Sequence, residues 1–226
     1  MITLNSDAAS TSLSKTTKAI LNEYGIKLNK NLGQNYLIDR NKRDQIIQFG
    51  NLTKDDVVLE IGPGIGTLTI ELAKRVKKVI AIEQDSNICQ ILENRLKKEN
   101  IDNIELINDD ALNVEFPKFD KIISNLPYQI SSPITFKFLN YDFQLAILMY
   151  QKEFASRMNG KVGSKDYSRL SAMLYFKCDV DLLTGVSAES FIPKPKVDST
   201  VVRLTPKLPE LNGQLKHLNI NEINEK

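Results

Sequence analysis

Apolar residues in this chain alternate between short continuous runs and stretches with helical spacing, most regularly between residues 56 and 150. Runs that are apolar on both faces are typical of strands buried in a parallel sheet, and amphipathic stretches between them are typical of covering helices. The pattern predicts strands over Val57–Ile61, Val79–Ile82, Ile104–Ile107, Lys121–Ser124 and Leu145–Tyr150, and helices over Gly66–Arg75, about 86–98 and Ile134–Leu139. This alternation predicts an α/β fold, a mostly parallel sheet with helices on both faces.

The segments on either side of this region are less regular. Before it we expect a helix over Lys15–Tyr24, a loop over Asn29–Asn35, and a helix over Arg40–Phe49 that Asp39 caps, with Ile46, Ile47 and Phe49 facing inward. After Gln151 we expect helices over Lys152–Met158 and Ser168–Phe176, and strands over Val180–Val186 and Thr200–Leu204 around the proline-rich loop at 193–195.

The composition excludes several classes of protein. The chain has 226 residues, of which 42% are apolar and 26% charged, as is ordinary for a folded protein. Its longest purely apolar stretch is six residues, Leu145–Tyr150, whereas a membrane-spanning helix needs about 20, so we expect no membrane span. Cys89 and Cys178 lie far apart and His217 is the only histidine, so we expect no metal site and a cytoplasmic, thiol-reducing location.

The net charge of +2 conceals an uneven distribution of charge along the chain. Basic residues prevail over 1–50 and 151–207, and acidic residues prevail over 51–150. Such flanks could form a basic rim for a polyanion such as nucleic acid. An evenly solvated surface with a chance imbalance explains the same counts, so both interpretations stay open.

A glycine-rich segment, Glu60–Gly66, ends the first predicted strand of the sheet and leads into a helix. Glycines let the backbone turn sharply and approach a ligand, and a helix N-terminus presents N–H groups to it. Glu83 ends the next strand, 21 residues after Gly62, which is the spacing at which a carboxylate meets the ribose of a nucleoside cofactor. The segment therefore predicts a nucleoside site, with a purely structural turn as the alternative.

The spacing of the glycines narrows the choice of cofactor. The dinucleotide pattern needs glycine where Thr67 stands, which favours a nucleoside without a pyrophosphate, such as S-adenosylmethionine. Asp110 follows the next predicted strand and is placed to contact the adenine amino group. Asp109 and Asp110 could instead be a solvated loop pair.

The segment Ser124–Tyr128 ends a further strand at the same edge of the sheet and is the most specific signal in the chain. The side-chain oxygen of Asn125 and the carbonyl of Leu126 can both accept hydrogens from an exocyclic amine, and Tyr128 offers a flat face for a base. The lone pair of adenine N6 is delocalised into the ring, so two acceptors that hold its hydrogens would localise it toward a methyl donor.

Four ordered motifs, at residues 31–39, 60–64, 125–133 and 191–199, resemble the ribosomal RNA adenine dimethyltransferase family, the small-subunit dimethyladenosine transferases. The resemblance covers roughly residues 27–206. Family relatives that act on large-subunit RNA usually read Asn-Ile-Pro-Tyr, whereas Leu126 and the following Gln129–Pro133 look more like the small-subunit branch in its archaeal or eukaryotic style. The resemblance implies a seven-stranded Rossmann-like methyltransferase fold.

The resemblance also implies a role for individual residues that bind the cofactor. Asn35 and Leu37 would close over it, Gly62 would contact its methionine part, Glu83 its ribose and Asp110 its adenine.

The target base would be held by a second group of residues. Asn125 would lie where cofactor and target amine meet, Leu126 and Tyr128 would belong to the base pocket, and Phe191 would stack on the other face of the base. From the sequence alone, Phe191 could equally be a core aromatic. A flipped base gripped between two aromatic rings is how enzymes reach an exocyclic atom.

Family members usually continue into a helical domain that grips RNA. We expect an N-terminal arm over residues 1–26, a catalytic domain over 27–206, and a short tail over 207–226 that is a remnant or truncation of that domain. The candidate RNA contacts are then the basic residues of the flanks, each of which could also be a solvated surface charge: Lys27, Lys30, Arg40, Lys42, Arg43, Lys152, Arg157, Lys161, Lys165, Arg169, Lys194 and Lys196.

The expected function is the S-adenosylmethionine-dependent N6,N6-dimethylation of two adjacent adenosines near the 3′ end of small-subunit ribosomal RNA, by a monomer acting on the immature subunit. Two other functions stay open. DNA N6-adenine methylation uses the same chemistry, although the motifs at 31–39 and 191–199 favour RNA. A ribosome-assembly factor that retains the cofactor site without needing turnover is the third hypothesis.

Overall fold

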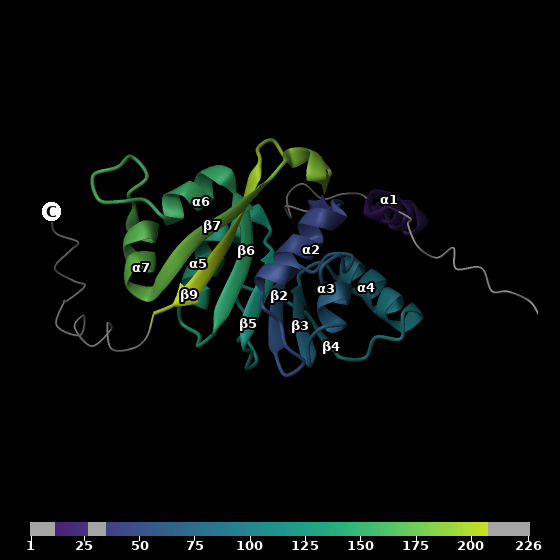
Figure 1. Ribbon diagram of the computed structural model, residues 1–226. Helices are drawn as coiled ribbons and strands as arrows, with labels where there is room; N and C mark the ends of the chain where they lie inside the picture. The colour runs from purple at the N-terminus through teal and green to yellow at the C-terminus, as the bar shows by residue number, and fades with distance from the viewer. Residues whose placement is uncertain (1–11, 27–34, 208–226) are drawn as a thin grey trace, which may run out of the picture.

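The computed structural model describes residues 12–26 and 35–207 and contains a seven-stranded sheet in the order β4-β3-β2-β5-β6-β9-β7 (Figure 1). The first five strands of that order are mutually parallel, and β9 runs antiparallel to β6 and β7. The predicted α/β fold is confirmed. The strands are β2 (Val57–Ile61), β3 (Lys78–Glu83), β4 (Ile104–Asn108), β5 (Lys121–Asn125), β6 (Leu145–Gln151), β7 (Cys178–Val186) and β9 (Ser199–Pro206).

Helices cover both faces of this sheet because its strands are apolar on both sides. Alternate residues of β2 point to opposite faces of the sheet. Val58 belongs to the hydrophobic cluster that includes residues of α2 and α3, and Leu59 belongs to the cluster that includes residues of α5, α6 and α7. Helix α4 lies over β4 and α3. These helices are α2 (Arg40–Phe49), α3 (Thr69–Ala73), α4 (Ser86–Lys98), α5 (Ser131–Phe138), α6 (Lys152–Met158) and α7 (Arg169–Lys177).

The observed start of a helix agrees with the predicted start where a side chain caps it, as in α2 and α4. Asp39 accepts from the N–H of Lys42 at 3.1 Å and begins α2, and Asp85 accepts from the N–H of Asn87 at 3.0 Å and begins α4. Ile46 and Ile47 are buried as predicted, and Phe49 is partly buried against the same core. Helix α5 begins three residues earlier than predicted, because proline is tolerated in a first turn, whose N–H groups lack intrahelical acceptors.

The predicted helix over Gly66–Arg75 is wrong at both ends, since α3 covers only five residues. Gly66 has a φ of +88°, which a right-handed helix does not contain, and a Cβ there would lie 2.6 Å from Leu92 Cδ1. The glycine-rich loop therefore continues to Leu68 before regular helix begins.

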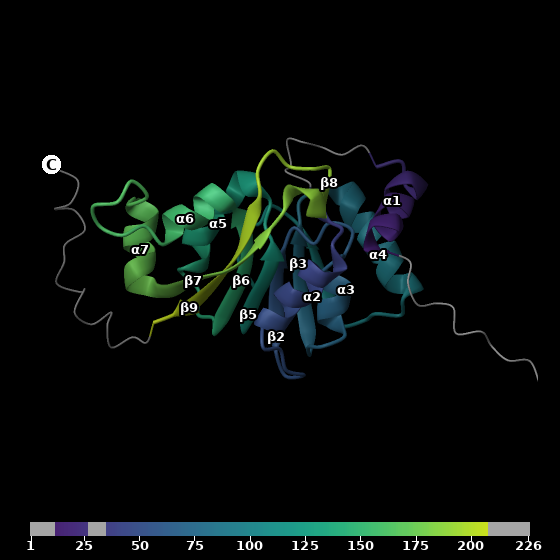
Figure 2. The ribbon, with the colours of Figure 1, turned by 45° about the horizontal axis from the view of Figure 1, so that its top comes forward.

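A two-stranded sheet that the sequence pattern did not predict pairs β1 (Tyr36–Leu37) with β8 (Phe191–Ile192) (Figure 2). Leu37 lies opposite Phe191, and the N–H of Ile38 donates to the Ser190 carbonyl at 2.8 Å. Strands of two residues are too short for periodicity to reveal. This pairing brings two of the four sequence motifs together.

The chain before β1 contributes one described helix, α1 (Leu13–Glu23), close to the predicted 15–24. Its Ile20 and Leu21 pack with Tyr36, Ile65 and Ile88. The loop expected over 29–35, apart from Asn35, and the tail after Lys207 lie outside the described residues. Within 12–26 and 35–207, no helix is long and apolar enough to cross a bilayer.

We predict that Lys121→Met destabilises the protein. Lys121 Nζ lies 2.9 Å from Asp56 Oδ2 and donates to the Asn51 carbonyl at 2.8 Å, and less than a tenth of either charged side chain is exposed. Removing one partner leaves a buried charge uncompensated, so the free energy of unfolding in urea should fall by about 3 kcal/mol. Lys97→Met, an exposed change on α4, is the matched control and should alter it by less than about 0.5 kcal/mol. Equal effects of the two changes would contradict this role for the ion pair.

Candidate active site

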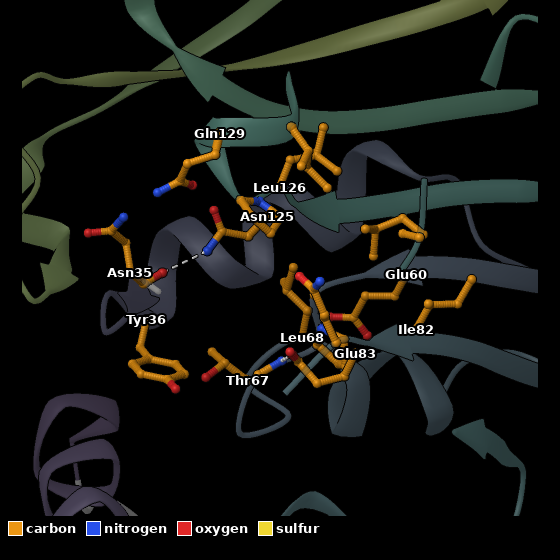
Figure 3. A pocket seen from close by; sticks show the side chains of 18 of the residues that line it. Asn35, Tyr36, Glu60, Thr67, Leu68, Ile82, Glu83, Asn125, Leu126 and Gln129 are labelled. Carbon is orange, nitrogen blue, oxygen red and sulfur yellow. Dashed lines mark hydrogen bonds between the residues drawn. The ribbon is translucent and has the colours of Figure 1, made fainter. Parts of the chain in front are cut away.

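A pocket opens at the carboxyl ends of β2, β3 and β5 (Figure 3). The strand order reverses here, because β3 and β4 follow β2 on one side of it and the chain then crosses to β5 on the other side. Crevices at such switch points are where open α/β sheets bind ligands. The pocket is lined by residues from β1, the glycine-rich loop, the loop after β4 and the segment after β5: Asn35, Tyr36, Leu37, Glu60, Ile61, Gly62, Pro63, Gly64, Thr67, Leu68, Ile82, Glu83, Gln84, Asp109, Asp110, Ala111, Asn125, Leu126, Pro127, Gln129 and Ile130.

The glycine-rich loop is enclosed between two other segments of the site. Gly62 and Gly64 have φ values of +68° and +55°, which favour glycine. A Cβ on Gly64 would lie 2.8 Å from Tyr36 Cε1, and one on Gly62 would lie 3.1 Å from the Pro127 ring. Bare backbone is therefore what lines this part of the pocket.

Glu83 is fixed by backbone N–H groups at the end of β3. Its Oε2 accepts from Gly64 at 3.2 Å, and its Oε1 accepts from Asp85 at 3.0 Å. Burial raises the pKa of Glu83, and these hydrogen bonds oppose the rise. The carboxylate thus joins the β3 terminus to the glycine-rich loop.

Glu60 is a site residue whose importance sequence reasoning missed. It is 2% exposed, it lines the pocket, and its Oε2 has no hydrogen-bond partner among the described residues. Burial raises the pKa of Glu60 to about 8; the neighbouring Thr69 hydroxyl opposes the rise, and the negative charge of Glu83 adds to it. The sequence did contain a signal for Glu60, because it is an acid inside the apolar run Val57–Ile61, where a buried charge is costly unless it is paired or hydrogen-bonded.

The pocket lining is acidic. Four carboxylates line it, from Glu60, Glu83, Asp109 and Asp110, and no lysine, arginine or histidine of the described chain does. Asp110 Oδ1 accepts from the N–H of Leu112 at 2.9 Å, a local bond that shapes the loop after β4. The lining fits a cationic ligand and disfavours a pyrophosphate.

The amide of Asn125 is oriented by the N-terminal segment. Its Nδ2 donates to the backbone carbonyl of Asn35 at 3.0 Å, as the dashed line in Figure 3 marks. This bond fixes the plane of the amide through one of its two N–H donors, and Oδ1 on the other side is an acceptor only. The expected arrangement of Asn35, Leu37 and Asn125 around one pocket is found, since Leu37, 1% exposed, also lines it.

The residues expected to hold the target base are assembled only in part. Leu126 lines the pocket and is 2% exposed. Tyr128 is half-buried beside the pocket, and its hydroxyl lies 2.6 Å from Ser199 Oγ. Phe191 is 2% exposed and packs in the core with Leu37, contrary to the expectation that it faces a base. The pairing of β8 with β1 turns this ring inward. Phe191 is therefore a core aromatic residue in this structure, which was the alternative interpretation of its motif.

The described residues include no group of three or more histidine, cysteine, aspartate or glutamate side chains that could hold a metal ion.

Comparison with known proteins identifies the family. A family model described as "Ribosomal RNA adenine dimethylase" matches residues 25–220. This chain belongs to that family. The resemblance inferred from the four motifs is confirmed, and the chain is accordingly a methyltransferase.

Two similar proteins come from archaea. A "Probable ribosomal RNA small subunit methyltransferase A" of Methanosphaera stadtmanae is 55% identical over 84% of this chain and 70% of its own length. A protein of the same description from Methanothermobacter thermautotrophicus is 52% identical over 84% of this chain and 68% of its own length.

Two solved structures share the fold of this chain. A dimethyladenosine transferase from Plasmodium falciparum is 40% identical, with a TM-score of 0.73, over 82% of this chain and 66% of that one. The 23S rRNA methyltransferase ErmE is 30% identical, with a TM-score of 0.70, over 84% of this chain and 81% of that one.

We predict that Gly64→Ala weakens binding of S-adenosylmethionine roughly tenfold, because the new Cβ would displace the Tyr36 ring at the pocket. Gly25→Ala is the matched control. Gly25 has a similar φ of +58°, but a Cβ there would meet nothing within 4 Å. Titration calorimetry on both variants separates the effect of crowding from that of backbone strain, and equal affinities would contradict the predicted contact.

Proposed function

We propose that this chain transfers methyl groups from S-adenosylmethionine to N6 of adenosine in small-subunit ribosomal RNA, forming N6,N6-dimethyladenosine at two adjacent adenosines near the 3′ end during ribosome biogenesis. The single observation that carries the proposal is the amide of Asn125, fixed by the Asn35 carbonyl at the rim of an acidic pocket. That arrangement leaves an acceptor where an exocyclic amine would enter.

The lining of the pocket fits S-adenosylmethionine. When bound, this cofactor supplies a methyl group on a positively charged sulfur. The four carboxylates suit its charge, and the bare backbone at Gly62 and Gly64 suits close approach of its methionine part. As the family resemblance implies, Glu83 would accept from ribose hydroxyls and Asp110 would accept from the adenine amino group.

The residues at the end of β5 act on the target amine. The Asn125 Oδ1 and the Leu126 carbonyl accept its two hydrogens, which concentrates the nitrogen lone pair on the side of the methyl donor. No covalent enzyme intermediate would be required, because a sulfonium is a good leaving group and the proximity of the two reactants would supply much of the rate. After the first transfer the nitrogen loses one proton to solvent and keeps one N–H, which one of the two acceptors can hold for the second transfer.

The target base would stack on Tyr128, which lies directly after Leu126 and Pro127 and whose hydroxyl Ser199 holds. Phe191 would have to leave the core to reach the other face of the base. One aromatic face contributes about 1–3 kcal/mol of stacking, so we assign the stacking to Tyr128 alone in the described conformation.

The choice of small-subunit RNA rests on the names of the archaeal relatives and on Leu126 in place of the isoleucine of large-subunit enzymes. We propose the immature small subunit as the substrate, a monomer as the active form and the cytoplasm as the location. We assign the chemistry to residues 27–206, with the arm over 1–26 and the tail over 207–226 outside it.

We predict that Asn125→Ala lowers the rate of methyl transfer roughly 100-fold or more, because an acceptor at the reacting nitrogen is lost. Affinity for S-adenosylmethionine should fall far less, by about tenfold at most, because the N-terminal segment loses one hydrogen bond but keeps its pairing with β8, and the carboxylates and the glycine-rich loop are untouched. Single-turnover transfer and equilibrium binding measure the two effects. Asn140→Ala, an exposed change after α5, is the control with unchanged transfer. Full activity of Asn125→Ala would refute the proposed mechanism.

A further inference from the structure

Two carboxylates of the pocket differ sharply in their surroundings. Glu83 has a backbone N–H group on each oxygen, whereas Glu60 Oε2 has no partner among the described residues. Both side chains come from adjacent parallel strands, and Figure 3 shows them turned toward the same space. Of the two, Glu83 is therefore built to carry a negative charge and Glu60 is not.

No element of the described chain that packs around Glu60 offers it a counter-charge. Strand β3 presents Glu83, the loop after β4 presents Asp109 and Asp110, β1 presents Tyr36, α3 presents the Thr69 hydroxyl, and β5 presents Ser124 and Asn125. The charged groups in this set are all carboxylates. An ionised, fully buried carboxylate without a cation is costly, and proteins avoid that cost by retaining the proton.

We propose that Glu60 is a neutral acid when no cofactor is bound and that it releases its proton to solvent when a positively charged nucleoside cofactor enters. The O–H bond of the carboxylic acid breaks, its electron pair stays on the oxygen, and the charge of the ligand takes the place of the proton. No oxidation is involved. This inference rests on the proposed use of S-adenosylmethionine, and it adds that cofactor binding is a proton exchange.

The sign of the pH dependence follows from this exchange. With the Glu60 pKa at about 8, the proton must leave at neutral pH, so affinity for the sulfonium cofactor rises with pH and levels off above about pH 8. S-adenosylhomocysteine, the thioether product, lacks the sulfonium charge and drives this ionisation less. Its affinity should therefore depend less on pH.

Titration calorimetry of the full chain at pH 7, in phosphate and in Tris, tests the exchange, because the heats of buffer ionisation reveal the number of protons released. S-adenosylmethionine should release close to one proton from the unaltered protein, and S-adenosylhomocysteine clearly fewer. The dissociation constant for S-adenosylmethionine should fall roughly tenfold or more between pH 6 and pH 8.

The variant Glu60→Gln should bind S-adenosylmethionine with no proton release and with less than about threefold change over that pH range. Glu93→Gln, an exposed change on α4, should behave as the unaltered protein does. Equal proton release in Glu60→Gln and the unaltered protein would overturn the inference, and so would equal release with both ligands, a comparison that does not depend on how the variant folds. Strong but pH-independent binding would overturn this inference and leave the proposed function standing, whereas absence of binding at every pH would overturn both.

Discussion

The hydrogen bond from Asn125 Nδ2 to the Asn35 carbonyl is the interaction on which the site depends. It joins the end of β5 to the segment that precedes α2, across 90 residues of sequence. That segment also packs Tyr36 against Gly64 and pairs Leu37 with Phe191. One contact thus fixes the orientation of the amide and holds the N-terminal segment over the pocket.

The second constraint is the absence of positive charge from the described pocket lining. Parallel strands leave their carboxyl ends open at one edge of the sheet, where β2 carries Glu60 next to its last residue, β3 ends in Glu83, and the loop after β4 begins with Asp109 and Asp110. Such a lining would repel a phosphate-bearing dinucleotide and would attract a sulfonium. Glu83 and Glu60 differ in how they tolerate a negative charge in this lining. Backbone N–H groups stabilise Glu83 as an anion, whereas Glu60 has no such donors.

Much of the fold could be predicted from the sequence, because buried parallel strands are continuous apolar runs and because Asp39 and Asp85 cap their helices. The bounds of β2, α2 and α6 were predicted without error. The pairing of β1 with β8 could not be predicted, since two-residue strands carry no periodicity. The end of the glycine-rich loop was misjudged, because the positive φ of Gly66 is set by packing against Leu92.

The site was predicted where local motifs determine it. Asn35, Leu37, Gly62, Glu83, Asp110, Asn125 and Leu126 line one pocket. The position of Phe191 could not be predicted from its motif, because long-range pairing with Leu37 decides which way the ring turns. The isolation of Glu60 was also invisible, since it depends on what the neighbouring elements do not provide.

The central claim is that this adenine dimethylase modifies N6 of adenosine in small ribosomal subunits. The most direct test is methyl transfer from labelled S-adenosylmethionine to small subunits that lack dimethyladenosine, with naked ribosomal RNA and duplex DNA in parallel and mass spectrometry of the nucleosides. The account predicts label in N6,N6-dimethyladenosine, on the subunits and not on DNA. Label on duplex DNA, or no transfer to subunits by protein that binds the cofactor, would contradict it.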